Sequence, residues 1–332
     1  MSSAGGMFSS TNDLISFASA IHTSRLLPAP ATRAWMKPDA HTSSAGVSVG
    51  AAWEILRGDG LTSDARLVDV YTKSGDLGLY HALLGIVPDY DVVVSVLAAG
   101  AEVTVDPYAR SRLFSAVLRS LLPAVEEAGR GEAKDTFEGT YTQESSNASL
   151  VLSSDDGPGL LIESFSVRGF DVLSNINSYS LAALESGVNP NPAKVEGRLY
   201  PSDRKSGGGG QSNGTTTTAW RAIFDAKTDE QRAELDKELF WLDGSCETWF
   251  GADRSAYNFL SLSDFHVVQG ANGDVLSIVN KAFNVTLTKV SGGGKGGEES
   301  GSDAVPESGA GAAQTSGLLV VLSTLLTVVA LS

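Results

Sequence analysis

The triplet Lys73-Ser74-Gly75 carries the clearest chemical pattern in the sequence. It closes an apolar run that predicts a strand, and Asp76-Leu77-Gly78 follow it. At a strand end, a lysine ammonium supplies positive potential for an acyl carboxylate, and a serine hydroxyl donates a hydrogen bond. The glycine lets a substrate approach the backbone, and the next amide can complete an oxyanion hole. Taken alone, the triplet is a weak signal and is more typical of a strand end that enters a turn.

Other reactive residues give weaker signals. The chain has one cysteine, Cys246, and four histidines without ligand-like spacing. One thiol cannot form a disulfide within the chain, and no cysteine–histidine cluster resembles a zinc site. We therefore expect no metal and no other cofactor. His81 lies near the triplet, but a strand histidine packed on a core face explains it better than a proton shuttle.

The region around the triplet, up to about residue 131, mixes helix and strand patterns. Ser10-Thr11-Asn12-Asp13 can cap a helix whose apolar positions are Leu14, Phe17, Ala18 and Ile21. Strands are predicted next, with a turn at Pro88-Asp89-Tyr90-Asp91, and then a long helix that starts at Pro107. The predicted elements are strands Val47–Leu56, Leu67–Lys73, Tyr80–Val87 and Val92–Leu97, and a helix from Pro107 to Glu127.

The following region, about 134–292, is rich in short strand patterns separated by Gly, Asn, Asp and Ser. A helix is predicted from Asp229 to Leu239. The insert Ser206–Thr218, with its glycines and threonines, predicts a solvated loop. Either an all-β sandwich or a small barrel fits this pattern.

Charge and the chain end bear on location. The net charge of −15 disfavours a nucleic-acid or anionic-membrane partner. Asn147, Asn213 and Asn284 each begin a glycosylation sequon, and we expect Asn213 to be the most accessible and Asn284, in a strand-like run, the least. An apolar tail from Leu318 follows small residues near Ser308 and a polar spacer, which is typical of a glycosylphosphatidylinositol signal with lipid attachment at Ser308. A buried terminal strand or a tail anchor is the other interpretation.

Several motifs occur together in one order. They resemble the class C β-lactamases and related esterases of the serine β-lactamase/penicillin-binding-protein family, over about residues 2 to 125. The motifs are Ser3-Ala4-Gly5-Gly6 leading to Leu14, Trp53-Glu54, Lys73-Ser74-Gly75, Gly78-x-Tyr80 and Ile86-Val87-Pro88-Asp89-Tyr90.

This resemblance implies an α+β fold: the C-terminal half of a β-lactamase/transpeptidase-like fold (antiparallel sheet plus helix), then a β-rich accessory domain of the type that fungal secreted members append. It matches Lys73 and Ser74 to the family's Lys-Thr-Gly box and the amide of Asp76 to the oxyanion donor. The Asp76 carboxylate departs from the family pattern, because it could oppose an anionic substrate. That departure puts β-lactam turnover in doubt.

The resemblance also implies a Ser-x-x-Lys nucleophile and a Tyr-x-Asn motif ahead of the Ser-Ala-Gly-Gly loop, and we expect both to lie before residue 1. The only Ser-x-x-Lys in the sequence, Ser202-Asp203-Arg204-Lys205, borders the glycine tract. A nucleophile must be held rigidly against its base, so we interpret this match as coincidence.

The expected organisation is a β-lactamase-related region at 1–131, an accessory domain at 134–292, a linker at 293–315 and a hydrophobic tail at 316–332. The expected function is serine hydrolysis of a small amide or ester through an acyl-enzyme, inactive in this chain by itself. An esterase would share the same site. The alternative is a non-catalytic, surface-anchored binding protein. For either function we expect the protein to be secreted or at the cell surface, held on the outer leaflet by its lipid anchor.

Overall fold

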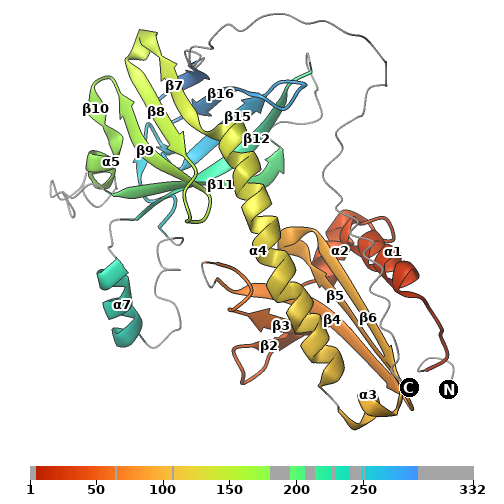
Figure 1. Ribbon diagram of the computed structural model, residues 1–332. Coiled ribbons are helices and arrows are strands. Elements are labelled where there is room, and N and C mark those ends of the chain that lie inside the picture. The colour runs from red at the N-terminus through yellow and green to blue at the C-terminus, as the bar shows by residue number, and fades with distance from the viewer. Residues whose placement is uncertain are drawn as a thin grey trace, which may run out of the picture. The chain divides into compact units, whose positions relative to one another are not determined.

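The computed structural model describes residues 5–63, 66–106, 108–179, 195–205, 214–225, 229–239, 249 and 251–290. They form two compact units, one with the residues up to Glu127 and one that begins at Ala128 (Figure 1). In the described part of the chain, no helix is both long and apolar enough to cross a membrane.

The first unit is built on a six-stranded antiparallel sheet whose order follows the sequence, β1-β2-β3-β4-β5-β6. Each strand joins the next by a local connection, which is why neighbours in sequence are neighbours in the sheet. Its strands are β1 (Ala40–His41), β2 (Val47–Val49), β3 (Glu54–Gly58), β4 (Val68–Leu77), β5 (Tyr80–Val87) and β6 (Val92–Ala99).

Helices cover both faces of this sheet. Helix α1 (Thr11–His22) begins at Ser10, whose side chain accepts from the Asp13 amide, and it buries Ala18 and Ile21. The opposite face packs on helix α4 (Ala109–Phe137). The α4 cluster joins Phe114, Leu118 and Leu122 to Val68, Val70 and Leu83, and the α1 cluster includes Trp53, Ile55 and Ile86. The shorter helices are α2 (Ala29–Trp35) and α3 (Ala101–Val105).

The structure refines several predicted elements of this unit. The predicted strand 47–56 is two strands, because the chain turns between Gly50 and Trp53 with Ala52 at a positive φ of 68°. Strand β4 continues beyond Lys73 to Leu77, so the triplet lies inside a strand. Phe17 is half-exposed and not part of the buried face of α1. Helix α4 runs ten residues past the predicted end, to Phe137.

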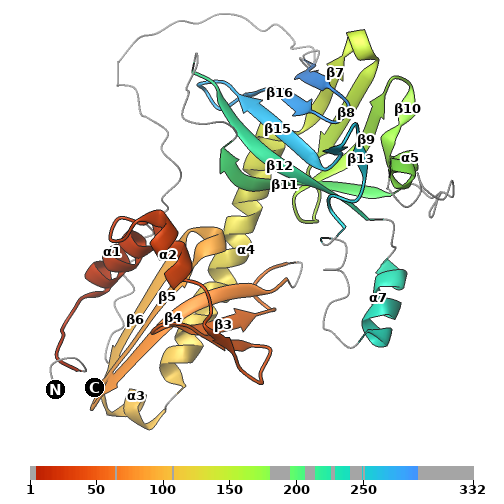
Figure 2. The same cartoon turned by 180° about the vertical axis from the view of Figure 1, so that it is seen from behind.

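The second unit is a closed barrel, which decides between the two predicted architectures. Its strands run in the order β10-β9-β11-β12-β15-β16-β17-β7-β8, and β8 also pairs with β9. Eight strands therefore form a ring, and the short strand β10 lies outside the ring, where it pairs with the end of β9 (Figures 1 and 2). The bounds are β7 (Gly139–Gln143), β8 (Ala148–Ser153), β9 (Leu160–Val167), β10 (Phe170–Asp171), β11 (Glu196–Lys205), β12 (Thr216–Asp225), β15 (Asp264–Gln269), β16 (Val275–Asn280) and β17 (Val285–Lys289).

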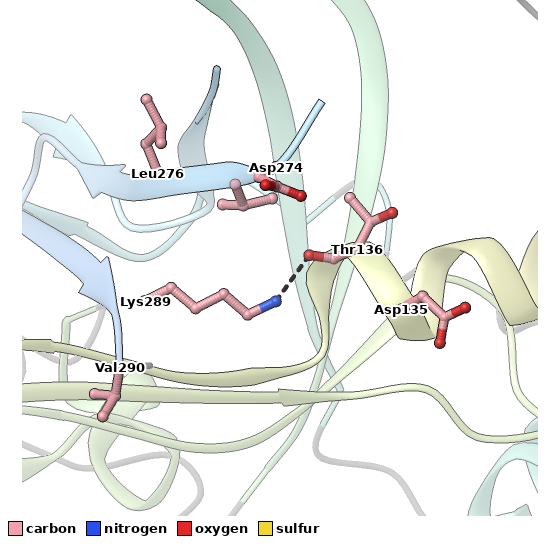
Figure 3. A pocket seen from close by; sticks show the side chains of 7 residues that line it. Asp135, Thr136, Asp274, Leu276, Lys289 and Val290 are labelled. Carbon is pink, nitrogen blue, oxygen red and sulfur yellow. Dashed lines mark hydrogen bonds between the residues drawn. The ribbon is translucent and has the colours of Figure 1, made fainter. Parts of the chain in front are cut away.

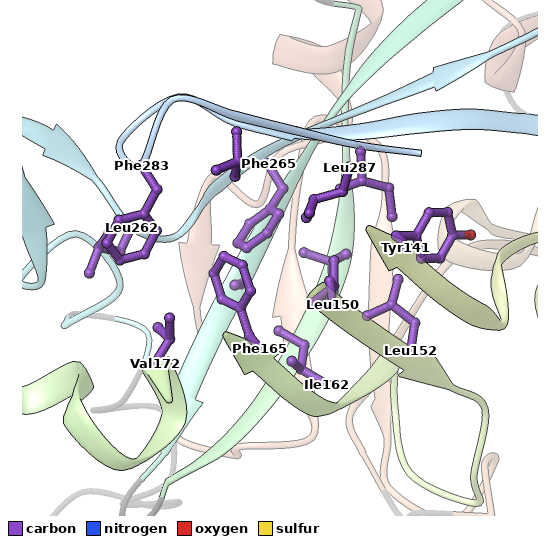
Figure 4. Packing of buried hydrophobic residues seen from close by; sticks show 14 of the residues in the cluster. Tyr141, Leu150, Leu152, Ile162, Phe165, Val172, Leu262, Phe265, Phe283 and Leu287 are labelled. Atoms are coloured by element: carbon purple, nitrogen blue, oxygen red, sulfur yellow. The ribbon is translucent and has the colours of Figure 1, made fainter. Parts of the chain in front are cut away.

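The barrel interior is a packed apolar core. Strand β8 alternates buried and half-buried residues, as expected when one face points inward. Phe165 lies against Phe265 and Phe283, with ring centroids 5.7 and 5.8 Å apart, and Tyr141 is fully buried (Figure 4). Small elements outside the ring are α5 (Val172–Asn175), α7 (Asp229–Glu238), β13 (Ala256–Tyr257) and β14 (Leu260–Ser261).

Two side chains of the barrel hold the end of α4. The Tyr141 hydroxyl donates to the carbonyl of Phe137 at 2.7 Å, and Lys289 Nζ donates to the carbonyl of Thr136 at 2.9 Å. The last carbonyls of a helix have no partner inside it, and a cation there also complements the helix dipole. These bonds explain why α4 ends where the first barrel strand begins.

Candidate active site

The predicted triplet lies where β4 outgrows its neighbour. Strand β3 pairs with β4 only from Val68 to Thr72, whereas the β5 ladder continues to Leu77. Among the described residues, no strand flanks residues 73–77 of β4 on the β3 side. Lys73, Ser74 and Asp76 therefore lie along an open strand edge.

Glu54, the first residue of β3, fills the start of this edge. Lys73 Nζ lies 2.5 Å from Glu54 Oε1, and Ser74 Oγ lies 2.9 Å from Oε2. The backbone amide of Ser74 also donates to Oε2, at 3.2 Å. Burial raises the pKa of Glu54, but the bonds from Lys73 and Ser74 outweigh it and the pKa falls below its usual value. The lysine and the serine thus converge on one carboxylate, which is the kind of group that the sequence predicts they bind.

Backbone geometry places a second amide on the same edge. Antiparallel strands point the N–H and C=O groups of alternate residues to the same side. The amide of Ser74 points to the β3 side, toward Glu54. The amide of Asp76, two residues on, therefore points to that side as well, where the resemblance requires an oxyanion donor.

The Asp76 carboxylate has its own partners. His81 Nδ1, on the neighbouring strand, and Arg110 Nη1, on α4, both lie 2.6 Å from its Oδ1. His81 Nε2 lies 3.0 Å from Thr104 Oγ1. The hydrogen bond from His81, and then the Arg110 charge, lower the pKa of Asp76. These contacts place the guanidinium of Arg110 beside the Asp76 carboxylate, and the expectation that Asp76 opposes an anionic substrate stays a prediction.

The sequence did not anticipate this part of the site. His81 was expected to pack on a core face, yet its side chain is a polar link between Asp76 and Thr104. Arg110 carried no motif. Glu54 stood in the motif order without a role. The cross-strand register Asp76↔His81 and the length of α4 bring these residues together.

The Ser-Ala-Gly-Gly loop reaches the same strand end. Ser3 and Ala4 lie outside the described residues, but Gly5 lies against Leu77, the last residue of β4. A Cβ on Gly5 would stand 3.2 Å from Leu77 Cδ2. Two motifs that are far apart in the sequence are therefore adjacent in this unit.

Ser202 has a structural environment. It lies on strand β11, and its hydroxyl donates to the carbonyl of Ala219 at 2.8 Å. The side chain of Lys205 lies outside the described residues. Ser202 is thus held in the barrel wall by a bond to the backbone.

The predicted modification sites are only partly described. Asn147 is exposed in a turn with a positive φ of 44°. Asn284 is exposed as well, in the turn that precedes β17, so the expectation that it lies in a strand is wrong. Asn213, Cys246, Ser308 and residues 291–332 lie outside the described residues.

A hollow lies on the surface of the barrel unit. Its volume is about 380 Å³, and Lys289 crosses it to reach Thr136 (Figure 3). Its lining is Asp135, Thr136, Asp274, Val275, Leu276, Lys289 and Val290. Because Lys289 already donates to the end of α4, we interpret the residues around this hollow as a support for the helix. Over the described residues, no three His, Cys, Asp or Glu side chains gather as metal ligands.

Comparison with known proteins gives the class. Residues 129–291 match the family described as beta-lactamase-like-like, C-terminal domain. The barrel is thus the C-terminal domain of a β-lactamase-like protein. No solved structure matches the chain.

Curated relatives extend the match beyond the barrel. A beta-lactamase-like protein of Arthroderma benhamiae is 31% identical over 262 residues, which cover 75% of this chain and 42% of the relative. The probable hydrolase clz13 of Cochliobolus lunatus is 26% identical over 273 residues, 77% of this chain and 40% of the relative. The chain spans about two fifths of the length of these relatives. The resemblance seen in the sequence is confirmed: the chain belongs to the β-lactamase-like family and carries its C-terminal part.

Proposed function

We propose that this chain supplies the lysine–serine side of a serine-hydrolase site that acts through an acyl-enzyme on a small amide or ester. The family is hydrolase-like, as the names of its relatives indicate. The observation that supports the proposal most is the convergence of Lys73 Nζ, Ser74 Oγ and the Ser74 amide on one carboxylate at an open strand edge.

The chemistry assigned to these groups is recognition and charge stabilisation. A nucleophilic hydroxyl attacks the substrate carbonyl, and the carbonyl oxygen becomes an oxyanion that the amide of Asp76 stabilises. The leaving group departs with a proton, and water then hydrolyses the ester bond of the acyl-enzyme. The nucleophile and its base are the family's Ser-x-x-Lys, which the described residues do not supply.

The test is hydrolysis of activated esters and β-lactams by the protein expressed from its full natural transcript. Lys73→Ala should lower kcat/KM by about 10²–10³, or about 2–4 kcal/mol, because it removes a charged contact to the substrate. Lys37→Ala, an exposed lysine of the same unit, is the matched control and should keep the activity. Equal activity of Lys73→Ala and Lys37→Ala would rule the proposal out.

The 332-residue chain alone should show no hydrolysis above background, and Ser202→Ala should change nothing. Activity that Ser202→Ala abolishes would place the nucleophile on the barrel and overturn the assignment. The engagement of Ser202 with Ala219 favours the first outcome.

The alternative function is a non-catalytic binding protein at the cell surface. The specific observation for it is that the one Ser-x-x-Lys in the sequence holds a serine with a structural bond. A natural transcript without Ser-x-x-Lys and Tyr-x-Asn ahead of Gly5 would favour this alternative over the enzyme.

We propose the location on separate grounds. Exposed Asn147 and Asn284 are accessible to glycosylation, and the tail sequence after Ser308 has the composition of a lipid-attachment signal. Phosphatidylinositol-specific phospholipase should release protein that lacks the tail from intact cells. Recovery of an intact C-terminal peptide from the membrane fraction would refute the anchor, and glycopeptides without sugar at Asn147 and Asn284 would refute secretion through a glycosylating pathway.

A further inference from the structure

The last residues of β4 are paired on one side only. The β3 ladder stops at Thr72, whereas the β5 ladder runs on to the pair Leu77↔Tyr80. An oxyanion donor stabilises the transition state best when it is already held in place before the reaction. The amide of Asp76 lies in this segment, so its position depends on contacts other than the β3 ladder.

Arg110, the second residue of α4, makes such contacts. Its Nη1 lies 2.6 Å from Asp76 Oδ1, and it donates to the carbonyls of Ala82 at 3.1 Å and Gly75 at 3.5 Å. Gly75 and Ala82 face each other in the β4–β5 register. One nitrogen of the guanidinium therefore ties α4 to both strands at the same level, one residue before Asp76.

The geometry of the peptide bond links this contact to the amide. The carbonyl of Gly75 and the N–H of Asp76 belong to one peptide unit, which is planar and trans, so the two groups point in opposite directions. Because the Ser74 amide points to the β3 side, the Gly75 carbonyl points to the β5 side, where Arg110 reaches it. A contact that fixes this carbonyl also fixes the direction of the Asp76 amide.

The carboxylate of Asp76 gives the segment a second fixed point. Its Oδ1 also lies 2.6 Å from His81 Nδ1, and His81 Nε2 lies 3.0 Å from Thr104 Oγ1 on α3. The side chains of Arg110 and His81 are only 13% and 16% exposed. Two largely buried partners on one oxygen make the Asp76 side chain an anchor for the strand.

We propose that Arg110 is a positioning residue, which holds the Gly75–Asp76 peptide so that the Asp76 amide stays directed at the oxyanion. This inference rests on the proposed function, because it concerns the oxyanion donor of the same site. Arg110 acts through the strand and not on the reacting atoms. Its loss should therefore weaken an interaction that forms in the transition state and leave ground-state binding of the substrate nearly unchanged.

Ester hydrolysis by the protein from its full natural transcript gives the kinetic test. Arg110→Ala should lower kcat by about 10–10², because a displaced donor loses much of its effect, and KM should stay within about twofold of the wild type. Arg119→Ala, an exposed arginine further along α4, is the matched control and should keep both constants.

Two further variants test the contact itself. Asp76→Asn keeps the amide but removes the charge that Arg110 contacts, so it should lower kcat by a smaller factor. Arg110→Ala/Asp76→Asn should lose no more than Arg110→Ala, because both changes break the same contact. Arg110→Lys repeats the kinetic test if Arg110→Ala melts at a lower temperature than the wild type. A lysine keeps the charge but lacks the planar fork, so the loss in kcat should remain.

Hydrogen exchange of the 332-residue chain tests the same contact without any turnover. Arg110→Ala should speed the exchange of the backbone amides of residues 73–84 by about tenfold, because this part of the β4–β5 hairpin opens more easily. Arg119→Ala should leave these rates unchanged.

Equal kcat for Arg110→Ala and wild type, a loss that appears only in KM, or equal exchange rates would overturn the inference. A wild type that hydrolyses no ester, together with faster exchange in Arg110→Ala, would refute the proposed function and leave the hold of Arg110 on β4 intact. Ester hydrolysis by the wild type that Arg110→Ala leaves unchanged would refute this inference alone.

Discussion

The two units differ in how far their strands are paired. In the barrel each of the eight ring strands has a neighbour on both sides, whereas in the described sheet of the first unit β1 and β6 each have one. Exposed apolar side chains follow the same division. Among the described large apolar residues, the first unit exposes five by two thirds or more: Met7, Phe8, Tyr80, Val105 and Tyr108. In the second unit Phe259, at the tip of the β13–β14 hairpin outside the ring, is the one described residue exposed to that extent.

This difference teaches where each unit gets its stability and where it can do chemistry. A closed ring pairs its backbone groups and fills its interior with side chains, so the barrel needs no further strand for its stability. An open sheet leaves backbone donors and acceptors at its ends. The candidate site uses one such place, the part of β4 beyond the β3 ladder. The open part of β4 thus carries the candidate site, and open edges also lower the stability of the first unit.

Separate expression of the two units should show the largest effect. We expect residues 128–290 to be monomeric and to melt cooperatively, because the ring is closed. Residues 5–127 should aggregate or bind a hydrophobic dye, because β6 (Val92–Ala99) presents an unpaired apolar edge. Size-exclusion chromatography and dye fluorescence make the measurement. A well-behaved monomer from residues 5–127 would remove the contrast between the units.

Truncation of the barrel core should have the next largest effect. Phe165 is 1% exposed and packs on Phe265 and Phe283, so Phe165→Ala should cost about 3–5 kcal/mol in the free energy of unfolding. Urea denaturation of the full chain, followed by hydrogen exchange in each unit, should place the loss in the barrel. Leu276→Ala, at a 47% exposed position of β16, is the control and should cost far less. Similar losses for both would contradict a filled interior.

Overpacking tests the contact between the sheet and α4. A Cβ at Gly85 on β5 would overlap the ring of Phe114, so Gly85→Ala should destabilise the first unit by about 1–3 kcal/mol. A Cβ at Gly75 on β4 would meet nothing within 4 Å, and Gly75→Ala is the matched control for stability. Thermal unfolding compares the two variants. Equal melting temperatures would show that Phe114 does not lie over Gly85.

A surface ion pair of the barrel should give the smallest effect. Hydrogen bonds from Arg198, at 2.9 and 2.7 Å, lower the pKa of Asp155, although burial acts against them. A lowered folded-state pKa contributes stability that is present above the unfolded value of about 3.9 and is lost as pH falls through the folded value. The carboxylate is 36% exposed, so we expect less than about 1 kcal/mol.

Asp155→Asn should therefore be slightly less stable than the wild type at pH 7 in urea denaturation, and this difference should shrink as the pH falls below about 4. A wild-type advantage that grows as the pH falls below 4 would contradict the sign of the shift.

Local sequence determined much of the secondary structure. The cap at Ser10, the apolar strand runs around the triplet and the turn at Pro88 all form as predicted, because capping, alternation and turn chemistry act over a few residues. The same local rules misjudged Val47–Leu56. A continuous apolar run does not reveal a tight turn inside it.

Only the tertiary structure decided the site and the barrel. Glu54 meets Lys73, and Arg110 meets Asp76, through strand register and helix packing between residues far apart in the chain. The ring closes where Thr288 on β17 pairs with Thr142 on β7. Such pairings depend on which distant surfaces fit together. Sequence motifs could therefore supply the lysine, the serine, the glutamate and the family resemblance, but not the contact of the Glu54 carboxylate with Lys73 and Ser74.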